Sequence, residues 1–205
     1  MKEHPILFSA PMVRAILEGR KTQTRRVVAH PGLANLSYVV DCGDGWWGDE
    51  EGDFQARCPY GEPGDRLWVR ETWAETDHSD GTPVVSYRAG GCIAVGRDGI
   101  RGPVCLLSTI AWDETPHVDQ WRPSIHMPRW ASRILLEVTG VRVERLQEIT
   151  VSDAICEGYD GSITDPIDPS IRWYSALWEQ INGPASWEAN PWVWVISFRR
   201  IEGAA

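Results

Sequence analysis

Residues 17–28 read Leu-Glu-Gly-Arg-Lys-Thr-Gln-Thr-Arg-Arg-Val-Val, and they join a predicted helix to a predicted strand. Upstream of this junction, apolar residues recur at helical spacing: Met12, Val13, Ile16 and Leu17. Gly19 stands where a glycine commonly ends a helix. The residues that follow, 20–28, alternate and contain two threonines, which favours a strand. The sequence therefore predicts a polar, cationic strand that begins directly at a helix end.

Other strands are predicted further along the chain. Alternating patterns indicate strands at 66–73, 84–88, 133–146 and 191–201, and Gly140 marks a candidate bulge. In the last strand, Val193, Val195 and Ser197 share one face, and the other face carries Trp192, Trp194, Ile196 and Phe198. The spacing of these predicted strands is typical of a mostly β chain.

Two more helices are predicted in the second half of the chain. Residues 150–158 are typical of a short capped helix that a glycine ends. Residues 171–181 form an amphipathic pattern, whose expected apolar side consists of Trp173, Leu177, Trp178 and Ile181. There is no regular strand–helix alternation and no Gly-rich phosphate loop. We therefore expect an α+β fold, a small mixed β-barrel with about three flanking helices.

The 205 residues are expected to form a single domain with two long loop insertions. The first, at about 31–62, is rich in Gly and Asp and predicts loops with a short hairpin at most. The second, at about 89–120, shows little periodicity. Residues 121–130 contain two prolines and predict an ordered loop rather than a helix interior.

Composition excludes several classes of protein. The net charge of −9 argues against a protein that coats long duplexes, although a small basic pocket is compatible with it. No apolar run is long enough to cross a bilayer, and the N-terminus does not resemble a secretory signal. The five cysteines form no CxxC pair, which is typical of reduced thiols in the cytoplasm. The five histidines lack zinc-site spacing, so we expect no metal and no cofactor.

Four segments, taken in order, resemble the ASCH domain family, whose fold is PUA-like. They are Gly19-Arg20-Lys21-Thr22 at the helix end, Gly64-Asp65-Arg66-Leu67-Trp68-Val69, the short helix that ends in Asp153-Ala154-Ile155-Cys156-Glu157-Gly158, and the closing strand Trp192–Phe198. In detail the chain is most similar to the larger ASCH-type proteins of bacteriophages and prophages. The resemblance implies a PUA-like barrel that handles RNA or modified nucleosides.

A bacterial ASCH subgroup hydrolyses the amide of N4-acetylcytidine, and its essential residues are a Lys-x-x-Thr pair and a glutamate of the short helix. The resemblance therefore implies Lys21, Thr24 and Glu157 as catalytic residues. The chain departs from that subgroup in length, because the subgroup's members are about half as long. Amide hydrolysis needs a nucleophile, a proton acceptor and a charge stabiliser. The residues alone do not choose between Lys21 and Thr24 as the nucleophile.

Other polar and aromatic side chains are candidates for substrate binding. Glu71, at a strand end, is the alternative to Glu157 as the pocket carboxylate. Tryptophan rings can stack on a base, although core packing is the commoner use of a tryptophan. The complete set of expected binding residues is Arg20, Arg26, Arg70, Glu71, Trp73, His126 and Trp130.

Three classes of function remain open at this point: an amidohydrolase acting on a modified nucleoside, a non-catalytic module that binds RNA or a modified nucleotide, and a phage accessory protein acting through protein contacts. The acidic composition argues against long RNA as a ligand, but not against a single nucleotide.

Overall fold

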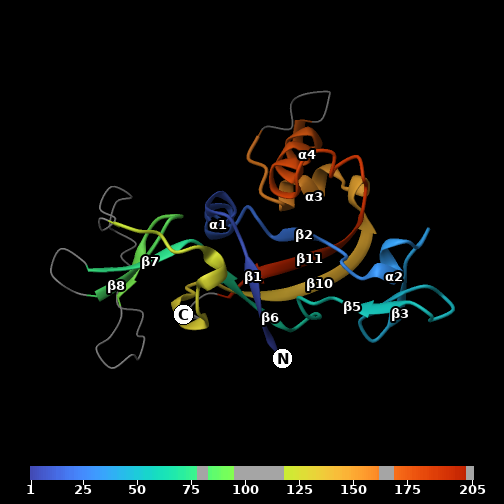
Figure 1. Ribbon diagram of the computed structural model, residues 1–205, viewed down its shortest axis with the longest axis horizontal. Helices are drawn as coiled ribbons and strands as arrows, with labels where there is room; N and C mark the ends of the chain where they lie inside the picture. Colours follow the sequence, from blue (N-terminus) through green and yellow to red (C-terminus); the bar gives the residue numbers. More distant parts are fainter. Residues whose placement is uncertain (78–82, 95–117, 162–168, 202–205) are drawn as a thin grey trace.

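The computed structural model describes residues 1–77, 83–94, 118–161 and 169–201. Its centre is a curved five-stranded sheet (Figure 1) with the strand order β1-β6-β10-β11-β2. These strands are β1 (Glu3–Leu7), β2 (Gln23–Val27), β6 (Arg66–Arg70), β10 (Leu135–Arg145) and β11 (Trp192–Arg200). β1 pairs with β6 in parallel, and all other pairs in this sheet are antiparallel. The predicted α+β class is therefore confirmed.

Four α-helices are present among the described residues: α1 (Ala10–Leu17), α2 (Pro31–Ala34), α3 (Val151–Cys156) and α4 (Pro169–Asn182). Three of them were predicted, and α2 is an additional single turn. In the same part of the chain, the short 3-10 helices η2 (Ser124–His126), η3 (Arg129–Ala131) and η4 (Leu146–Glu148) precede or follow β10. In Figure 1, α3 and α4 lie together over the end of the curved sheet, close to β2 and β11.

Two small antiparallel sheets extend the molecule on either side of the central sheet (Figure 1). One consists of β3 (Val40–Gly43), β4 (Trp46–Gly48) and β5 (Gln55–Arg57), so the first insertion is more ordered than the expected loops. The other consists of β7 (Trp73–Asp77), β8 (Pro83–Tyr87) and β9 (Cys92–Ala94). The predicted strand 66–73 is thus divided between two sheets, with its break at 71–72. Most of the expected second insertion, 95–117, lies outside the described residues.

β11 is buried on both faces, and its alternation was predicted correctly. Trp192, Trp194, Ile196 and Phe198 belong to the main hydrophobic core, together with residues of α1, β6 and β10. Val193 and Val195 face the other way and pack in a second cluster with side chains of α3 and α4. The bulge expected at Gly140 is confirmed, because the β10–β11 register shifts between Val138 and Gly140. The strand therefore joins the core of the sheet to the layer formed by α3 and α4.

The predicted closed barrel is wrong for the residues that the structure describes. β1 and β2 are the two edges of the five-stranded sheet, and no ladder pairs them with each other. One side chain bridges these edges instead: an Arg26 Nη donates a hydrogen bond to the Leu7 carbonyl oxygen at 2.8 Å. The sheet curls toward closure and leaves a seam between β1 and β2.

The predicted apolar side of α4 is right at Trp178, which is buried, and at Trp173, which packs against the same cluster, but it differs elsewhere. The buried residues of this helix are Ser170, Tyr174 and Trp178, one turn apart on a single face, whereas Ile181 is exposed. The helix therefore turns a tyrosine, rather than only tryptophans and aliphatic residues, toward the sheet.

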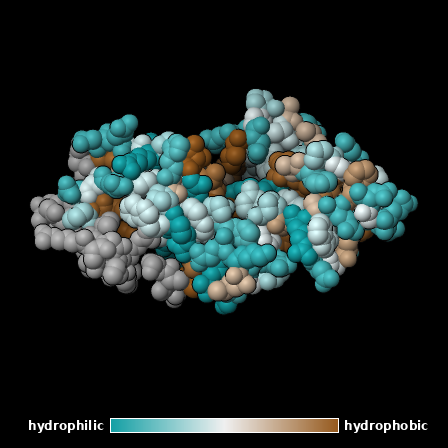
Figure 2. Space-filling view, turned by 60° about the horizontal axis from the view of Figure 1, so that its bottom comes forward, coloured by the Kyte–Doolittle hydropathy of each residue, from teal (hydrophilic) through white to brown (hydrophobic). Residues whose placement is uncertain are grey.

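None of the helices within the described ranges combines the length and the apolar composition that a membrane span requires. Figure 2 shows a mainly hydrophilic face, with hydrophobic side chains gathered in its upper middle part.

Candidate functional site

The junction between α1 and β2 holds Lys21 in a fixed place. Gly19 has a φ of 76°, which allows the chain to turn at the end of α1. The backbone amides of Arg20 and Lys21 then both donate to the carbonyl oxygen of Ala15, at 2.9 and 3.0 Å. The next amide, that of Thr22, donates to the Cys156 carbonyl oxygen at 2.8 Å. This bond ties the start of the strand to the end of α3.

The end of α3 approaches this junction closely because it carries a glycine. Gly158 has a φ of 108°, and a Cβ at this position would lie 3.2 Å from the Cβ of Ala15 and 3.5 Å from that of Lys21. An Arg20 Nη also donates to the Gly158 carbonyl oxygen at 2.6 Å. The residue before this glycine, Glu157, is thereby brought against Lys21.

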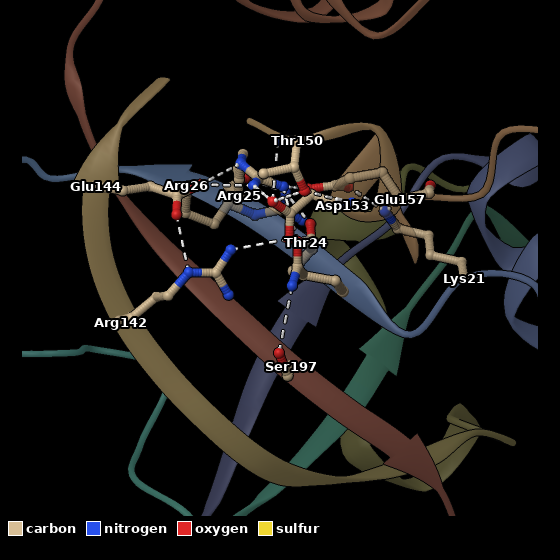
Figure 3. A network of polar contacts seen from close by, with 11 residues as sticks. Lys21, Thr24, Arg25, Arg26, Arg142, Glu144, Thr150, Asp153, Glu157 and Ser197 are labelled. Carbon is tan, nitrogen blue, oxygen red and sulfur yellow. Dashed lines mark hydrogen bonds and ion pairs between the residues drawn. The ribbon is translucent and has the colours of Figure 1, made fainter. Parts of the chain in front are cut away.

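Lys21 and Glu157 form a fully buried ion pair. Lys21 Nζ lies 2.5 Å from Glu157 Oε2 and 3.0 Å from the Glu157 carbonyl oxygen (Figure 3). The two residues are 2% and 3% exposed. Removing one partner of such a pair leaves an uncompensated buried charge, which is strongly destabilising. The pair that the family resemblance implied is therefore in direct contact, although the two residues are far apart in the sequence.

Arg25 connects this pair to a larger network of charges (Figure 3). It donates to Glu157 Oε1 at 3.2 Å and to Glu144 Oε1 at 2.6 Å, and it lies 3.3 Å from Asp153 Oδ2. Arg142 completes the network through Glu144 and Asp153. Three basic and three acidic side chains are thus gathered beneath α3, so their formal charges balance.

Burial and pairing change the titration of several members of this network. Burial lowers the pKa of Lys21 from its usual 10.5, and the attraction of Glu157 only partly offsets that effect. For Arg25, burial acts to lower the pKa, but Glu157, Tyr174 and Glu144 outweigh it, and the pKa is raised. Burial would raise the pKa of Asp153, yet hydrogen bonds from Thr150 and the attraction of Arg25 lower it to about 2.

A cavity of about 480 Å³ opens at the seam between β1 and β2, beside this network. The end of β1 and the start of α1 line it, together with β2 and α4. Its charged lining, as far as the structure describes the chain, consists of Arg25, Arg26 and Glu157. Lys21 does not border the cavity, because its side chain is wholly buried behind Glu157. The size lies within the range of small-molecule sites in proteins.

Thr24 and Arg26 share the face of β2 opposite to Arg25, and both line the cavity. Thr24 Oγ1 accepts a hydrogen bond from an Arg26 Nη at 2.8 Å. Within the described ranges, no carboxylate pairs with the Arg26 guanidinium, which lies over the Phe8 ring at 5.3 Å from its centroid. The cavity therefore holds a hydroxyl beside a cation that lacks an acidic partner there.

Tyr174 is a member of the site that the sequence did not indicate. It lines the cavity, and its hydroxyl shares a hydrogen bond with Glu157. Burial, and next the nearby Glu157 carboxylate, raise the pKa of Tyr174 well above its usual 10. The residue lies on α4, beyond a Pro- and Asp-rich segment, and only the spacing to Ser170 and Trp178 could have placed it on the buried face.

Most of the expected substrate-binding residues lie outside this cavity. Glu71 is buried, but it pairs with Arg133. Each of its carboxylate oxygens accepts a hydrogen bond from a different nitrogen of the Arg133 guanidinium, at 2.9 Å. Trp73 is buried against Trp130 in an edge-to-face contact, and His126 is exposed in η2.

The two remaining arginines of that set also lie apart from the cavity. Arg20 pairs with Glu18 at the end of α1. Arg70 lies over the ring of Trp68, at 5.5 Å from its centroid. Of the seven expected binding residues, only Arg26 lines the cavity.

One acidic cluster has a spacing that a cation could use. The carboxylate oxygens of Asp49, Glu51 and Asp53, between β4 and β5, lie within 4.8 Å of one another. Glu51 and Asp53 are exposed, and the cluster is separate from the cavity at the seam. Exposed acidic groups of this kind are common without an ion, so the cluster assigns no metal to the protein.

No family model matches the chain, and no curated protein matches it. Among solved structures, the chain is similar to an ASCH domain from Lactobacillus crispatus JV V101. The two sequences are 12% identical, the match covers 97% of this chain and 79% of that chain, and the TM-score is 0.42. It is also similar to a DUF984 protein from Enterococcus faecalis V583, with 10% identity, coverage of 98% and 81%, and a TM-score of 0.39.

Proposed function

We propose that this protein is an amidohydrolase that removes the acyl group from an N4-acylated cytidine. The observation that carries the proposal is the buried Lys21–Glu157 pair, whose carboxylate lines a ligand-sized cavity beside Thr24 and Arg26. Thr24, Glu157 and Arg26 can supply a nucleophile, a proton carrier and a charge stabiliser, respectively. Amide hydrolysis requires these three groups. The motif resemblance at Lys21, Thr24 and Glu157 supports the same chemistry.

Thr24 supplies the nucleophile in this proposal, because it lines the cavity and Lys21 does not. As Thr24 Oγ1 attacks the amide carbonyl carbon, its proton passes to the Glu157 carboxylate. The Arg26 guanidinium stabilises the negative charge that develops on the carbonyl oxygen. Glu157 then gives the proton to the leaving N4 nitrogen, the C–N bond breaks, and cytidine is released.

Water completes the cycle by hydrolysing the ester on Thr24. Glu157 takes a proton from the water as the water attacks the ester carbonyl, and it returns that proton to Thr24 Oγ1 as the carboxylic acid departs. Lys21 and Arg25 hold the Glu157 carboxylate in place between these transfers. Lys21 therefore acts as a positioning residue.

The test is hydrolysis of N4-acetylcytidine by the purified protein, followed by chromatography. We expect the wild-type protein to release cytidine, and the Lys21→Ala and Thr24→Val variants to lose that activity. Thr76→Val is the matched control, because Thr76 bonds to Ser86 in the β7–β8 sheet, away from the cavity. It should retain turnover.

Two results would overturn the proposal. One is the absence of cytidine release by folded wild-type protein. The other is release that neither Lys21→Ala nor Thr24→Val reduces. If the folded protein binds cytidine or its acetylated form without turnover, the site is a binding module for modified nucleotides instead.

A further inference from the structure

The mouth of the seam cavity is lined by aliphatic side chains that water reaches. Leu7, Val27 and Ile181 are 42%, 44% and 56% exposed, and all three line this cavity. They come from the ends of three separate elements, β1, β2 and α4. Large aliphatic side chains gathered at one place on a mainly hydrophilic surface indicate a binding site for an apolar group.

Leu177, one turn before Ile181 on α4, continues this apolar wall into the cavity. The polar groups of the site lie elsewhere in the same cavity: Thr24, Arg26 and Glu157 around the reacting position, and the hydroxyl residues Ser9, Thr72 and Ser124 on segments other than α4. The cavity is thus divided between an aliphatic wall and a set of hydrogen-bonding residues.

We propose that the natural substrate carries an acyl chain of several carbons, which lies against Val27, Leu177 and Ile181. This inference rests on the proposed function and specifies its substrate class. An acetyl group has a single methyl beyond the carbonyl and would leave this wall in water, whereas a chain of four to six carbons would cover it. The ribose hydroxyls suit Ser9, Thr72 and Ser124 rather than the aliphatic wall.

The reaction is unchanged by the longer chain. Water adds across the amide C–N bond, the acyl group leaves as a fatty acid of the same length, and cytidine keeps its N4 amine. The longer acyl chain gains contact area with the aliphatic wall. Each methylene buried in a fitted pocket raises kcat/KM about tenfold or more relative to the substrate that lacks it.

The test compares N4-hexanoylcytidine with N4-acetylcytidine as substrates of the full-length protein. We expect kcat/KM for the hexanoyl compound to exceed that for the acetyl compound by at least about tenfold. Val27→Ser and Ile181→Ser should reduce this ratio severalfold, because they place hydroxyls along the chain. Tyr38→Ser, which removes a comparably exposed ring that does not line the cavity, should leave the ratio unchanged.

The outcomes separate the inference from the proposed function. Turnover of both substrates with a ratio near one, or with a preference for acetyl, overturns the acyl-chain inference and leaves the amidohydrolase in place. A ratio that the two serine variants do not change also overturns it. Turnover of neither substrate by folded protein overturns the proposed function and the inference together.

Discussion

Glu157 shows how several weakly informative residues combine into one site. In the sequence it is a glutamate at the end of a short helix, a position that is usually on the surface. In the structure its carboxylate accepts hydrogen bonds from Lys21 and Arg25 and shares one with Tyr174. The same side chain lines the cavity. The spacing of Lys21 and Thr24 was visible in the sequence. Tyr174 was not, because its role depends on how α4 is rotated against β2.

Tyr174→Phe tests that contact at the level of one hydroxyl. The hydroxyl helps to hold the carboxylate that transfers the proton, so we expect this variant to lose kcat severalfold with little change in KM. Tyr87→Phe removes another buried hydroxyl, one that donates to the Ala131 carbonyl oxygen, and should leave kcat and KM unchanged. A similar loss of kcat in both variants would indicate packing alone and contradict this role.

Among the elements, strands with strict alternation were predicted best. β10, β11 and the helix–strand pair α1–β2 were found where the pattern indicated. β1 was missed, because Glu3–Leu7 contains a proline and shows no clear alternation, and it forms only through parallel pairing with β6. The barrel was predicted closed, but β1 and β2 meet through the Arg26 side chain rather than a ladder. Such non-local pairing is not encoded in a local pattern.

α3 is a short element whose stability depends on its cap. Thr150 and Asp153 form a reciprocal capping box, and Asp153 also pairs with Arg25 and Arg142. Asp153→Asn should lower the free energy of unfolding by roughly 1 kcal/mol at neutral pH. The change is measured by chemical denaturation.

The same carboxylate predicts how stability depends on pH. Its folded-state pKa of about 2 lies below the ordinary aspartate value of about 3.9, so its contribution is complete above pH 4 and is lost as the pH falls through 2. The wild-type protein should therefore lose more stability than Asp153→Asn between about pH 4 and 2. Parallel stability curves for the two proteins in this window would contradict the assignment.

β11 separates the two hydrophobic clusters that support the site. One cluster fills the curved sheet, and the other holds α3 and α4, and with them Glu157 and Tyr174, against β2 and β11. A third, smaller cluster supports the β7–β8–β9 sheet and contains Val85. The site therefore depends on the second cluster more than on the third.

Val195→Ala and Val85→Ala test this division with the same chemical change. Both valines are fully buried, so each variant should lose on the order of 1–3 kcal/mol of stability. Only Val195→Ala loosens the layer of α3 and α4, so only this variant should also lower kcat/KM at a temperature where both proteins are folded. Equal activity losses in the two variants would indicate that the effect comes from global stability.

In the proposed mechanism the carboxylate at the seam, Glu157, transfers the proton. Glu71, a second buried carboxylate that is paired with an arginine, does not. The most direct measurement is the rate of cytidine release from N4-acetylcytidine by Glu157→Gln and Glu71→Gln, each confirmed to be folded. We predict that Glu157→Gln loses about 10²–10⁴-fold in rate and that Glu71→Gln keeps a rate close to that of the wild-type protein. An unchanged rate in Glu157→Gln, or a larger loss in Glu71→Gln, would contradict it.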